Sequence, residues 1–350
     1  MNTSIRASRR AAAWVMAIAL AFLGVQDVAA QKSDRAGTAG AAQLLIPVTA
    51  RNSALGNNST GGLSTMSGLE GIFSNPAILS VNGGTAAMFS RMEYVADIGV
   101  NFIGLGQRIG NNNIAFTLTS WDLGDIPVQT ELAPEISDLT YNATKLTVGF
   151  TYARQLTDRI AAGTTLKAVN EAIEDVSGTA IAFDAGMTYL VGETGLRMGV
   201  SLQNIGSELR YSGTGMVRQV RLTDQNPTAT TNAVAIESAG VELPSLLNFG
   251  LAYTRGLGSQ GSVTFMGNFR SNSFDQDQFS GGIELGFQDI VYVRGGYQYQ
   301  EDPDRTFFTG ASVGAGLNLN VGDNRLSVDY AYVPTDFFDA VQYITASVTL

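Results

Sequence analysis

The amino-acid sequence predicts an all-β protein, a 14-stranded antiparallel transmembrane β-barrel with an N-terminal plug segment. Three observations lead to this prediction. The chain of 350 residues opens with an export signal, it has no later apolar stretch long enough for a membrane-spanning helix, and from residue 84 onward short segments alternate apolar and polar residues. Alternation with period two marks strands that have two unlike faces. In hydrocarbon, such strands satisfy all their backbone groups only by closing into a barrel.

The first thirty residues predict a secretory signal peptide. Arg6, Arg9 and Arg10 form a basic beginning, residues 11–25 form an apolar run, and residues 28–30 provide a small-residue cleavage site. The apolar run is shorter than the ~20 residues that a helix needs to cross a bilayer, which disfavours a transmembrane anchor. We therefore expect cleavage after residue 30 and export of the mature chain.

The segment between the signal peptide and the alternating part predicts a plug. It lacks regular alternation but carries many apolar side chains that need cover, together with a stretch rich in Gly, Asn and Ser and the motif Asn75-Pro76-Ala77. The barrel interior is the simplest place in which such a segment can bury its apolar side chains. The predicted order is a signal peptide at 1–30, a plug or hatch segment at 31–83 and a transmembrane barrel at 84–350.

Fourteen segments alternate, and their connections are alternately short and long. The two longest connections are expected near 121–144 and 206–243. Short turns at one end and long loops at the other are typical of barrels of the bacterial outer membrane, where the apolar stripes contact lipid. A soluble β-protein such as a propeller is disfavoured, because the polar stripes consist mainly of Gly, Ser, Thr and Asn. The predicted strand cores are 85–92, 97–106, 113–120, 145–153, 160–168, 181–190, 196–205, 245–254, 262–270, 279–287, 291–299, 308–319, 325–333 and 341–350.

Several charged residues share the polar stripes and are therefore expected to face the lumen. Because positive and negative side chains occur on neighbouring strands, we interpret these residues as an ion-paired network that fills the interior. The alternative is a charged permeation path. The residues are Asp97, Lys167, Asp184, Arg197, Arg270, Glu284, Arg294 and Asp329.

The composition excludes several kinds of chemistry. The chain contains no His and no Cys, which rules out a Ser-His-Asp triad, a His-ligated or thiolate-ligated zinc site and disulfides. We therefore expect neither an enzyme nor a bound cofactor. Acidic runs at 275–277 and 301–304 have the oxygen ligands that Ca²⁺ prefers, but solvated loops are the simpler interpretation. A net charge of −10 disfavours a nucleic-acid partner.

Short motifs in the plug segment resemble a known family. Residues 45–51 read LIPVTAR, a Gly-rich run passes through Gly61 and Gly62, and residues 73–77 read FSNPA. This order resembles the opening of the PorV/PorQ family of FadL-like outer-membrane barrels. Leu243-Pro244 and the run at 248–253 resemble the eighth strand of that family. Ile78 stands where the family usually has Gly.

The resemblance implies a role in the type IX secretion system. PorV-type barrels bind the translocon and receive secreted proteins with C-terminal sorting domains for surface attachment or release, and PorQ-type members belong to the attachment complex. The leading prediction is therefore a binding and shuttle component of protein secretion. The alternative is a FadL-like channel for long-chain fatty acids or other hydrophobic small molecules, with an apolar cavity near the plug.

The long connection at 206–243 is the expected surface for secretion partners. It carries apolar residues among polar ones, and exposed apolar groups often mark interaction sites. An ordinary surface loop is the alternative interpretation. The expected contact residues are Leu209, Tyr211, Met216, Val217 and Val220.

Overall fold

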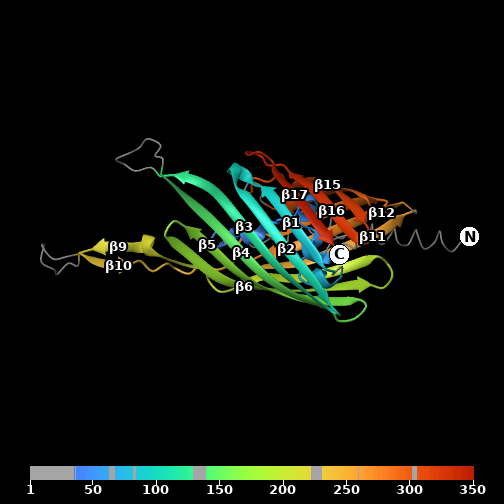
Figure 1. Cartoon of the computed structure of the whole chain (residues 1–350), viewed down its shortest axis with the longest axis horizontal. Helices are drawn as coiled ribbons and strands as arrows, with labels where there is room; N and C mark the ends of the chain where they lie inside the picture. The colour runs from blue at the N-terminus through green and yellow to red at the C-terminus, as the bar shows by residue number, and fades with distance from the viewer. Residues whose placement is uncertain are drawn as a thin grey trace, which may run out of the picture. The chain divides into compact units, whose positions relative to one another are not determined.

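A computed structural model describes residues 35, 37–62, 68–81, 84–128, 139–221, 231–258, 260–301 and 306–350. The predicted signal peptide lies outside these residues. Within the described part of the chain, no helix is long and apolar enough to span a bilayer. The strands form one large antiparallel sheet that closes on itself (Figure 1).

The closed sheet is a barrel of fourteen strands, which confirms the predicted fold class. Closure is made by the first and last strands, since Ala86 on β1 lies opposite Thr349 on β17 and β1 also pairs with β2. Every predicted strand core overlaps one of the observed strands. They are β1 (Ala86–Glu93), β2 (Gly99–Ile109), β3 (Asn112–Pro127), β4 (Thr140–Gln155), β5 (Ile160–Ile173), β6 (Val176–Val191), β7 (Leu196–Gly206), β11 (Leu246–Leu257), β12 (Gly261–Asn272), β13 (Gln278–Phe287), β14 (Val291–Gln300), β15 (Ala311–Val321), β16 (Asn324–Val333) and β17 (Val341–Thr349).

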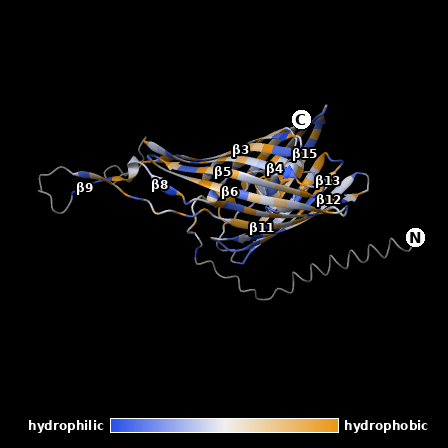
Figure 2. Ribbon diagram, turned by 90° about the horizontal axis from the view of Figure 1, so that it is seen from below, coloured by the Kyte–Doolittle hydropathy of each residue, from blue (hydrophilic) through white to orange (hydrophobic). Residues whose placement is uncertain are grey.

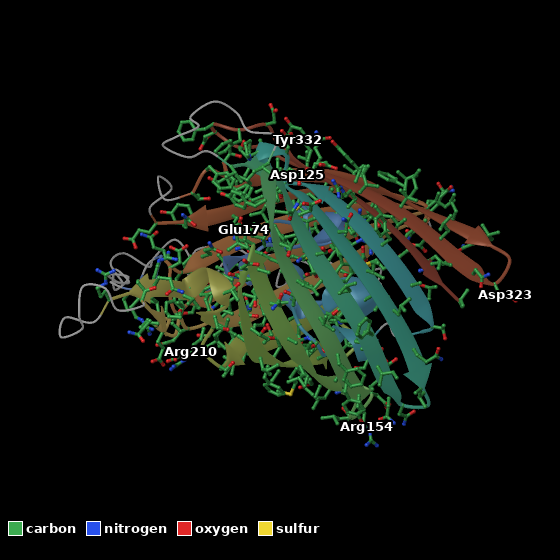
Figure 3. The ribbon with its side chains drawn as sticks, turned by 60° about the vertical axis from the view of Figure 1, so that its left-hand side comes forward. Asp125, Arg154, Glu174, Arg210, Asp323 and Tyr332 are labelled. Atoms are coloured by element: carbon green, nitrogen blue, oxygen red, sulfur yellow. The ribbon has the colours of Figure 1, made fainter. Side chains whose placement is uncertain are left out.

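The two ends of the barrel differ, and we name them the turn end and the loop end. At the turn end, tight connections use Gly110, Gly192 and Gly322 at positive φ, a conformation that favours glycine. In outer-membrane barrels this end faces the periplasm. Figure 3 shows Arg154 and Asp323 near the turn end, and Glu174 at the loop end.

One predicted long loop is mostly strand. The connection expected at 121–144 shrinks to residues 128–139, because β3 and β4 extend toward the loop end beyond Gly99, where β2 begins. The register shifts between Asp122 and Asp125, and Gly124 there has a φ of 76°. These strands, together with β5 and β6, rise higher than the rest of the wall at the loop end.

The outer face of the barrel is apolar. On β11 the side chains of Phe249 and Leu251 are 49% and 40% exposed, whereas those of Asn248 and Ala252 are buried in the interior. Figure 2 shows the resulting alternation of hydrophobic and hydrophilic bands along the strands. Outward tyrosines lie near both ends of the strands, as expected of aromatic girdles at the two membrane interfaces. They include Tyr152, Tyr189 and Tyr253 toward the turn end and Tyr297, Tyr299 and Tyr332 toward the loop end.

Residues 35–81, as far as they are described, lie inside the barrel, and we call them the inner segment. Its short helices are η1 (Ala42–Leu45), α2 (Ala50–Ala54), η2 (Ser59–Gly61), α3 (Gly68–Gly71) and α4 (Ile78–Val81). The main core of the protein is the contact between this segment and the inward side chains of the strands, with Leu69 and Ile72 against Val100 and Phe102. The backbone comes so close to the wall at Gly199 that a Cβ there would overlap the carbonyl of Thr60.

The connection between β7 and β11 is partly structured. It contains β8 (Arg210–Ser212), which pairs with β6, then η4 (Thr214–Met216) and a separate hairpin of β9 (Val217–Val220) and β10 (Asn232–Ala235). Figure 1 shows this hairpin beyond the loop end of the strands.

Asp97 does not face the lumen, contrary to the prediction. It lies in η3 (Val95–Asp97), between β1 and β2, and is exposed. The reason is a turn in which Ala96 and Asp97 both have positive φ, so that β2 begins only at Gly99.

Candidate functional site

A buried cluster of five charged side chains joins the inner segment to the barrel wall. On the wall, Arg294 lies 2.6 Å from Glu284 and 2.5 Å from Asp329. Arg51, on α2 of the inner segment, lies 3.7 Å from Glu284, 3.8 Å from Asp329 and 3.2 Å from Glu70. All five side chains are at most 2% exposed. We call this group the central ion cluster.

The central ion cluster fixes the inner segment electrostatically. Two guanidinium groups face three carboxylates, and both lie over the ring of Tyr292, with Cζ at 5.6 Å for Arg51 and 5.4 Å for Arg294 from its centroid. Removing one member of a buried ion pair leaves its partner as an uncompensated buried charge, which costs about 3–5 kcal/mol. The cluster therefore holds α2 strongly against β13, β14 and β16.

A second charged pair lies on β5 and β6. Lys167 Nζ is 2.7 Å from Asp184 Oδ2, and it donates a hydrogen bond of 2.6 Å to Asn204 Oδ1. Asp184 also accepts a 2.8 Å hydrogen bond from the backbone N–H of Asn204, which lies in an irregular stretch of β7 at positive φ. The pair thus stabilises a bulge in the wall.

Two residues that were predicted to belong to the ion-paired network in the lumen do not take part in it. Among the described residues, Arg197 and Arg270 form no ion pair. Arg197 lies near the turn end beside Gly62 of the inner segment, and its Nη1 is buried. The hydrogen bonds of Arg270 to other described side chains go to the neutral amides of Asn248 and Gln278. The prediction that Arg197 belongs to the ion-paired network is therefore wrong, because Arg197 lies opposite Leu190, several residues closer to the turn end than the bulge beside Asp184.

The motif Asn75-Pro76-Ala77 connects the inner segment to the wall. Asn75 Nδ2 donates hydrogen bonds to the carbonyls of Thr60 (3.0 Å) and Met187 (3.1 Å), and its Oδ1 accepts one from the N–H of Ala77 (3.0 Å). Asn75 is fully buried. Its amide therefore satisfies backbone groups of both the inner segment and β6.

The inner segment also contacts the β7–β11 connection at the loop end. Leu209 is fully buried against Leu44 and Leu243, and Arg35 pairs with Glu242 at 2.7 Å. The hydroxyl of Tyr211 donates a 2.5 Å hydrogen bond to Glu171. Burial and this hydrogen bond raise the pKa of Tyr211 above its ordinary value.

These contacts correct part of the predicted partner surface. Leu209 cannot belong to an exposed contact surface, because it fills a core beneath the connection, and Tyr211 is half-buried. Met216 and Val220 are also half-buried, and Val217 is exposed on the β9–β10 hairpin. What remains of the predicted surface is the hairpin itself.

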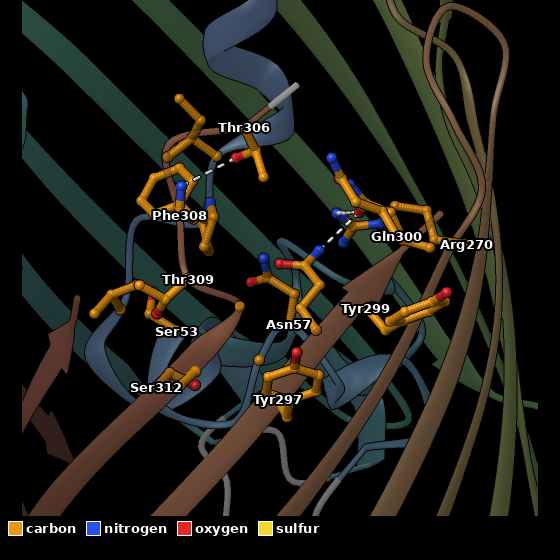
Figure 4. A pocket seen from close by; sticks show the side chains of 18 of the residues that line it. Ser53, Asn57, Arg270, Tyr297, Tyr299, Gln300, Thr306, Phe308, Thr309 and Ser312 are labelled. Carbon is orange, nitrogen blue, oxygen red and sulfur yellow. Dashed lines mark hydrogen bonds between the residues drawn. The ribbon is translucent and has the colours of Figure 1, made fainter. Parts of the chain in front are cut away.

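Among the described residues, several cavities border the inner segment. One lies at the turn end beside Gly62 and Arg197, and two others share no lining residue. The mouth cavity, about 310 Å³, opens toward the loop end between the inner segment and β12–β15. Figure 4 shows Arg270 and Gln300 on one side of it and Phe308 on the other. The inner cavity is smaller, about 60 Å³, and lies between the inner segment and β2–β7. Its apolar lining includes Leu44, Ile72, Phe73, Phe102 and Trp121.

Arg51 and Glu70 were not predicted as partners of the lumen charges. Both stand in a segment without alternation, so no period indicated which way they point. Their chemistry could have indicated this role. A segment expected to lie inside a barrel carries Arg51 and Glu70 among neutral residues, and buried charges need partners.

Comparisons with known proteins identify the fold. No family model matches the chain, and no curated protein matches it. Among solved structures, a CymD monoaromatic hydrocarbon channel superposes with a TM-score of 0.53 at 14% identity, covering 87% of this chain and 97% of that one. The toluene transporter TodX of Pseudomonas putida superposes with a TM-score of 0.53 at 12% identity, covering 87% and 96%. At these identities the likeness concerns the fold, that of a β-barrel of the outer membrane.

Proposed function

We propose that this outer-membrane barrel is a channel for small hydrophobic molecules, closed at rest by the inner segment acting as a plug. The observation that carries the proposal is the inner cavity, a pocket with an apolar side that lies between the inner segment and the barrel wall. Apolar pockets with a few polar groups are the usual form of small-molecule sites. Support also comes from the fold, which is shared with channels for monoaromatic hydrocarbons and toluene.

The arrangement of the lumen favours selective passage over an open pore. The inner segment is held against the wall by the central ion cluster and by Asn75, as expected of a plug rather than of an open pore. The other side of the inner cavity is polar and includes Thr117, Thr119, Thr147 and Gln203, together with the ion pair of Lys167 and Asp184. Because these two charges pair with each other, a neutral ring or short hydrocarbon leaves no charge there without its partner.

A single tryptophan provides the direct test. The chain has two tryptophans, Trp14 and Trp121, and cleavage after residue 30 removes the first. Trp121 is 4% exposed and lines the inner cavity. Toluene added to the mature protein in detergent should change the Trp121 emission saturably. In cells whose outer membrane contains lipopolysaccharide, expression should raise toluene uptake and leave raffinose uptake unchanged. An unchanged emission together with unchanged toluene uptake would contradict the channel.

A role in type IX secretion is the second candidate, and one feature favours it. The β9–β10 hairpin forms a two-stranded sheet of its own, with Val217 and Val234 exposed. Such a hairpin is marginally stable alone in water, so a partner strand or surface would stabilise it. In this proposal the partners are translocon and attachment-complex proteins and cargo with C-terminal sorting domains.

Deletion of residues 213–235 separates the two candidates. If the hairpin binds secretion partners, the deletion should abolish co-purification of sorting-domain proteins from native membranes, while the barrel remains heat-modifiable on gels. Toluene uptake should persist in the same variant if the channel proposal holds. Unchanged recovery of cargo by the deletion variant would remove the hairpin from consideration.

A further inference from the structure

The mouth cavity contains a buried cation without a carboxylate partner. Arg270 is 8% exposed and lines the cavity from β12. Its Nε donates a 3.0 Å hydrogen bond to Asn248 Oδ1 and its Nη1 a 3.5 Å hydrogen bond to Gln278 Oε1. Both acceptors are neutral amides, and within the described residues Arg270 forms no ion pair. By contrast, Arg51 and Arg294 each lie within 4 Å of at least two carboxylates.

The amides around Arg270 hold it in place but do not neutralise it. Gln278 Oε1 also accepts a 2.7 Å hydrogen bond from Gln298, and Gln278 Nε2 donates one of 3.2 Å to Gln300. The acceptor that faces Arg270 is thus shared, and the guanidinium is oriented by a ladder of amides across β13 and β14.

Neither acidic residue of the neighbouring loop forms an ion pair with Arg270. Asp275 lines the cavity, and its Oδ1 accepts a 2.8 Å hydrogen bond from the N–H of Gln276. Asp277 accepts one of 3.2 Å from the N–H of Asn272. A buried charge is costly without a counter-charge, so the missing partner of Arg270 is expected to come from the cavity.

The opposite wall and the volume define the rest of the ligand. Ile46, Pro47, Phe308 and Tyr343 give that wall an apolar surface. A volume of about 310 Å³ lies at the lower end of the ~300–1,000 Å³ that small-molecule pockets span. This size favours a single-ring compound over a long acyl chain.

We propose that the mouth cavity binds a small organic carboxylate with an aromatic or cyclic body, whose carboxylate pairs with Arg270 and whose ring packs against Phe308. This rests on the proposed channel function and makes it more specific: the mouth cavity is a binding site at the loop end for ring compounds that carry a carboxylate. A guanidinium binds a carboxylate through two parallel hydrogen bonds, a strong and directional contact.

Benzoate is the probe. Calorimetric titration of the detergent-solubilised mature protein should show saturable benzoate binding, and Arg270→Gln should weaken it at least about tenfold, the effect of losing a charge-assisted contact of roughly 1.4 kcal/mol. Arg270→Lys should retain part of the affinity. Arg255→Gln removes an exposed charge from β11 and should leave benzoate binding unchanged. Each variant should remain heat-modifiable, which shows that the barrel has folded.

Failure of this inference differs from failure of the channel. The inference is overturned if benzoate does not bind, or binds Arg270→Gln as tightly as the wild type, even while toluene still changes the Trp121 emission. It stands if benzoate binding requires Arg270, and in that case absent uptake of both benzoate and toluene overturns the channel alone. If Arg255→Gln weakened benzoate binding as much as Arg270→Gln, the inference would also be overturned, because the loss would then reflect the net charge of the protein.

Discussion

The guanidinium of Arg51, on the inner segment, lies 3.7 Å from the carboxylate of Glu284 on β13. The two residues are separated by most of the chain, yet both are 2% exposed. This contact, with the others of the central ion cluster, fixes the segment inside the barrel, and several predictions about stability and passage depend on it.

Arg51→Gln should loosen the inner segment. The change leaves Glu70, Glu284 and Asp329 with one guanidinium among three buried carboxylates, and we expect a loss of about 3–5 kcal/mol in the free energy of unfolding in urea. Planar-bilayer recordings should show larger and noisier currents than the wild type. Arg35→Gln is the matched control, because the Arg35–Glu242 pair is more than half exposed and such pairs contribute about 0–1 kcal/mol. Equal stability of the two variants would disprove the anchoring role.

Asp184→Asn should destabilise the bulge in β7. The carboxylate is paired with Lys167 and accepts the N–H of Asn204, so neutralising it leaves the ammonium without its counter-charge. A double-mutant cycle with Lys167→Met should give a coupling of roughly 0.5–3 kcal/mol. The measurement is urea unfolding of all four proteins in one detergent. A coupling near zero would mean that the two side chains act independently.

Gly199→Val should displace the inner segment without disrupting the barrel. A side chain at this position would overlap the carbonyl of Thr60, so the inner segment must move away from β7. We expect steady ion currents in planar bilayers and normal heat-modifiability. Gly256→Val is the control, since nothing lies within 4 Å of a Cβ at that position. If both variants remained as closed as the wild type, the inner segment would not be what blocks the lumen.

Tyr94, in the β1–β2 connection, should titrate late. Burial raises its pKa to about 12, in a cluster with Trp121 at 5.4 Å and Phe307 at 6.2 Å between ring centroids. The neutral phenol is favoured in the folded protein, so its contribution to stability is complete below pH 10 and is lost as the pH rises through 12. Absorbance at 295 nm should show Tyr94→Phe lacking this late step. Identical alkaline titrations of the two proteins would contradict the burial of Tyr94.

The strand positions could be predicted because lipid and lumen impose opposite polarities on alternate residues. At the loop end of β3 and β4, the outward side chains are no longer apolar. Asn142 and Thr144 there are polar and exposed, so the sequence resembles that of a loop. The inner segment shows no period at all. Its burial could be inferred from its apolar side chains, but the pairing of Arg51 with Glu284 and Asp329 depends on a fold of the segment that no local pattern specifies.

The candidate site was partly predictable for the same reason. Period two placed Glu284, Arg294 and Asp329 on the inward face, and the pairing of Glu284 with Arg294 follows from the adjacency of β13 and β14. Arg294 reaches Asp329 across β15, where Gly316 has no side chain in the way. Arg270 shares that face, but whether an inward charge has a partner depends on the inner segment and on the loops, which contribute amides there instead of carboxylates.

The measurement that tests the account most directly is toluene uptake through a barrel whose inner segment is locked in place. The chain has no cysteine, so Asn58→Cys with Ser280→Cys can introduce a single disulfide between the inner segment and β13, at side chains now joined by a 2.7 Å hydrogen bond. We expect cells carrying the oxidised variant to take up toluene no faster than cells without the protein, and reduction to restore wild-type uptake. Equal uptake before and after reduction would contradict a channel that opens by movement of the inner segment.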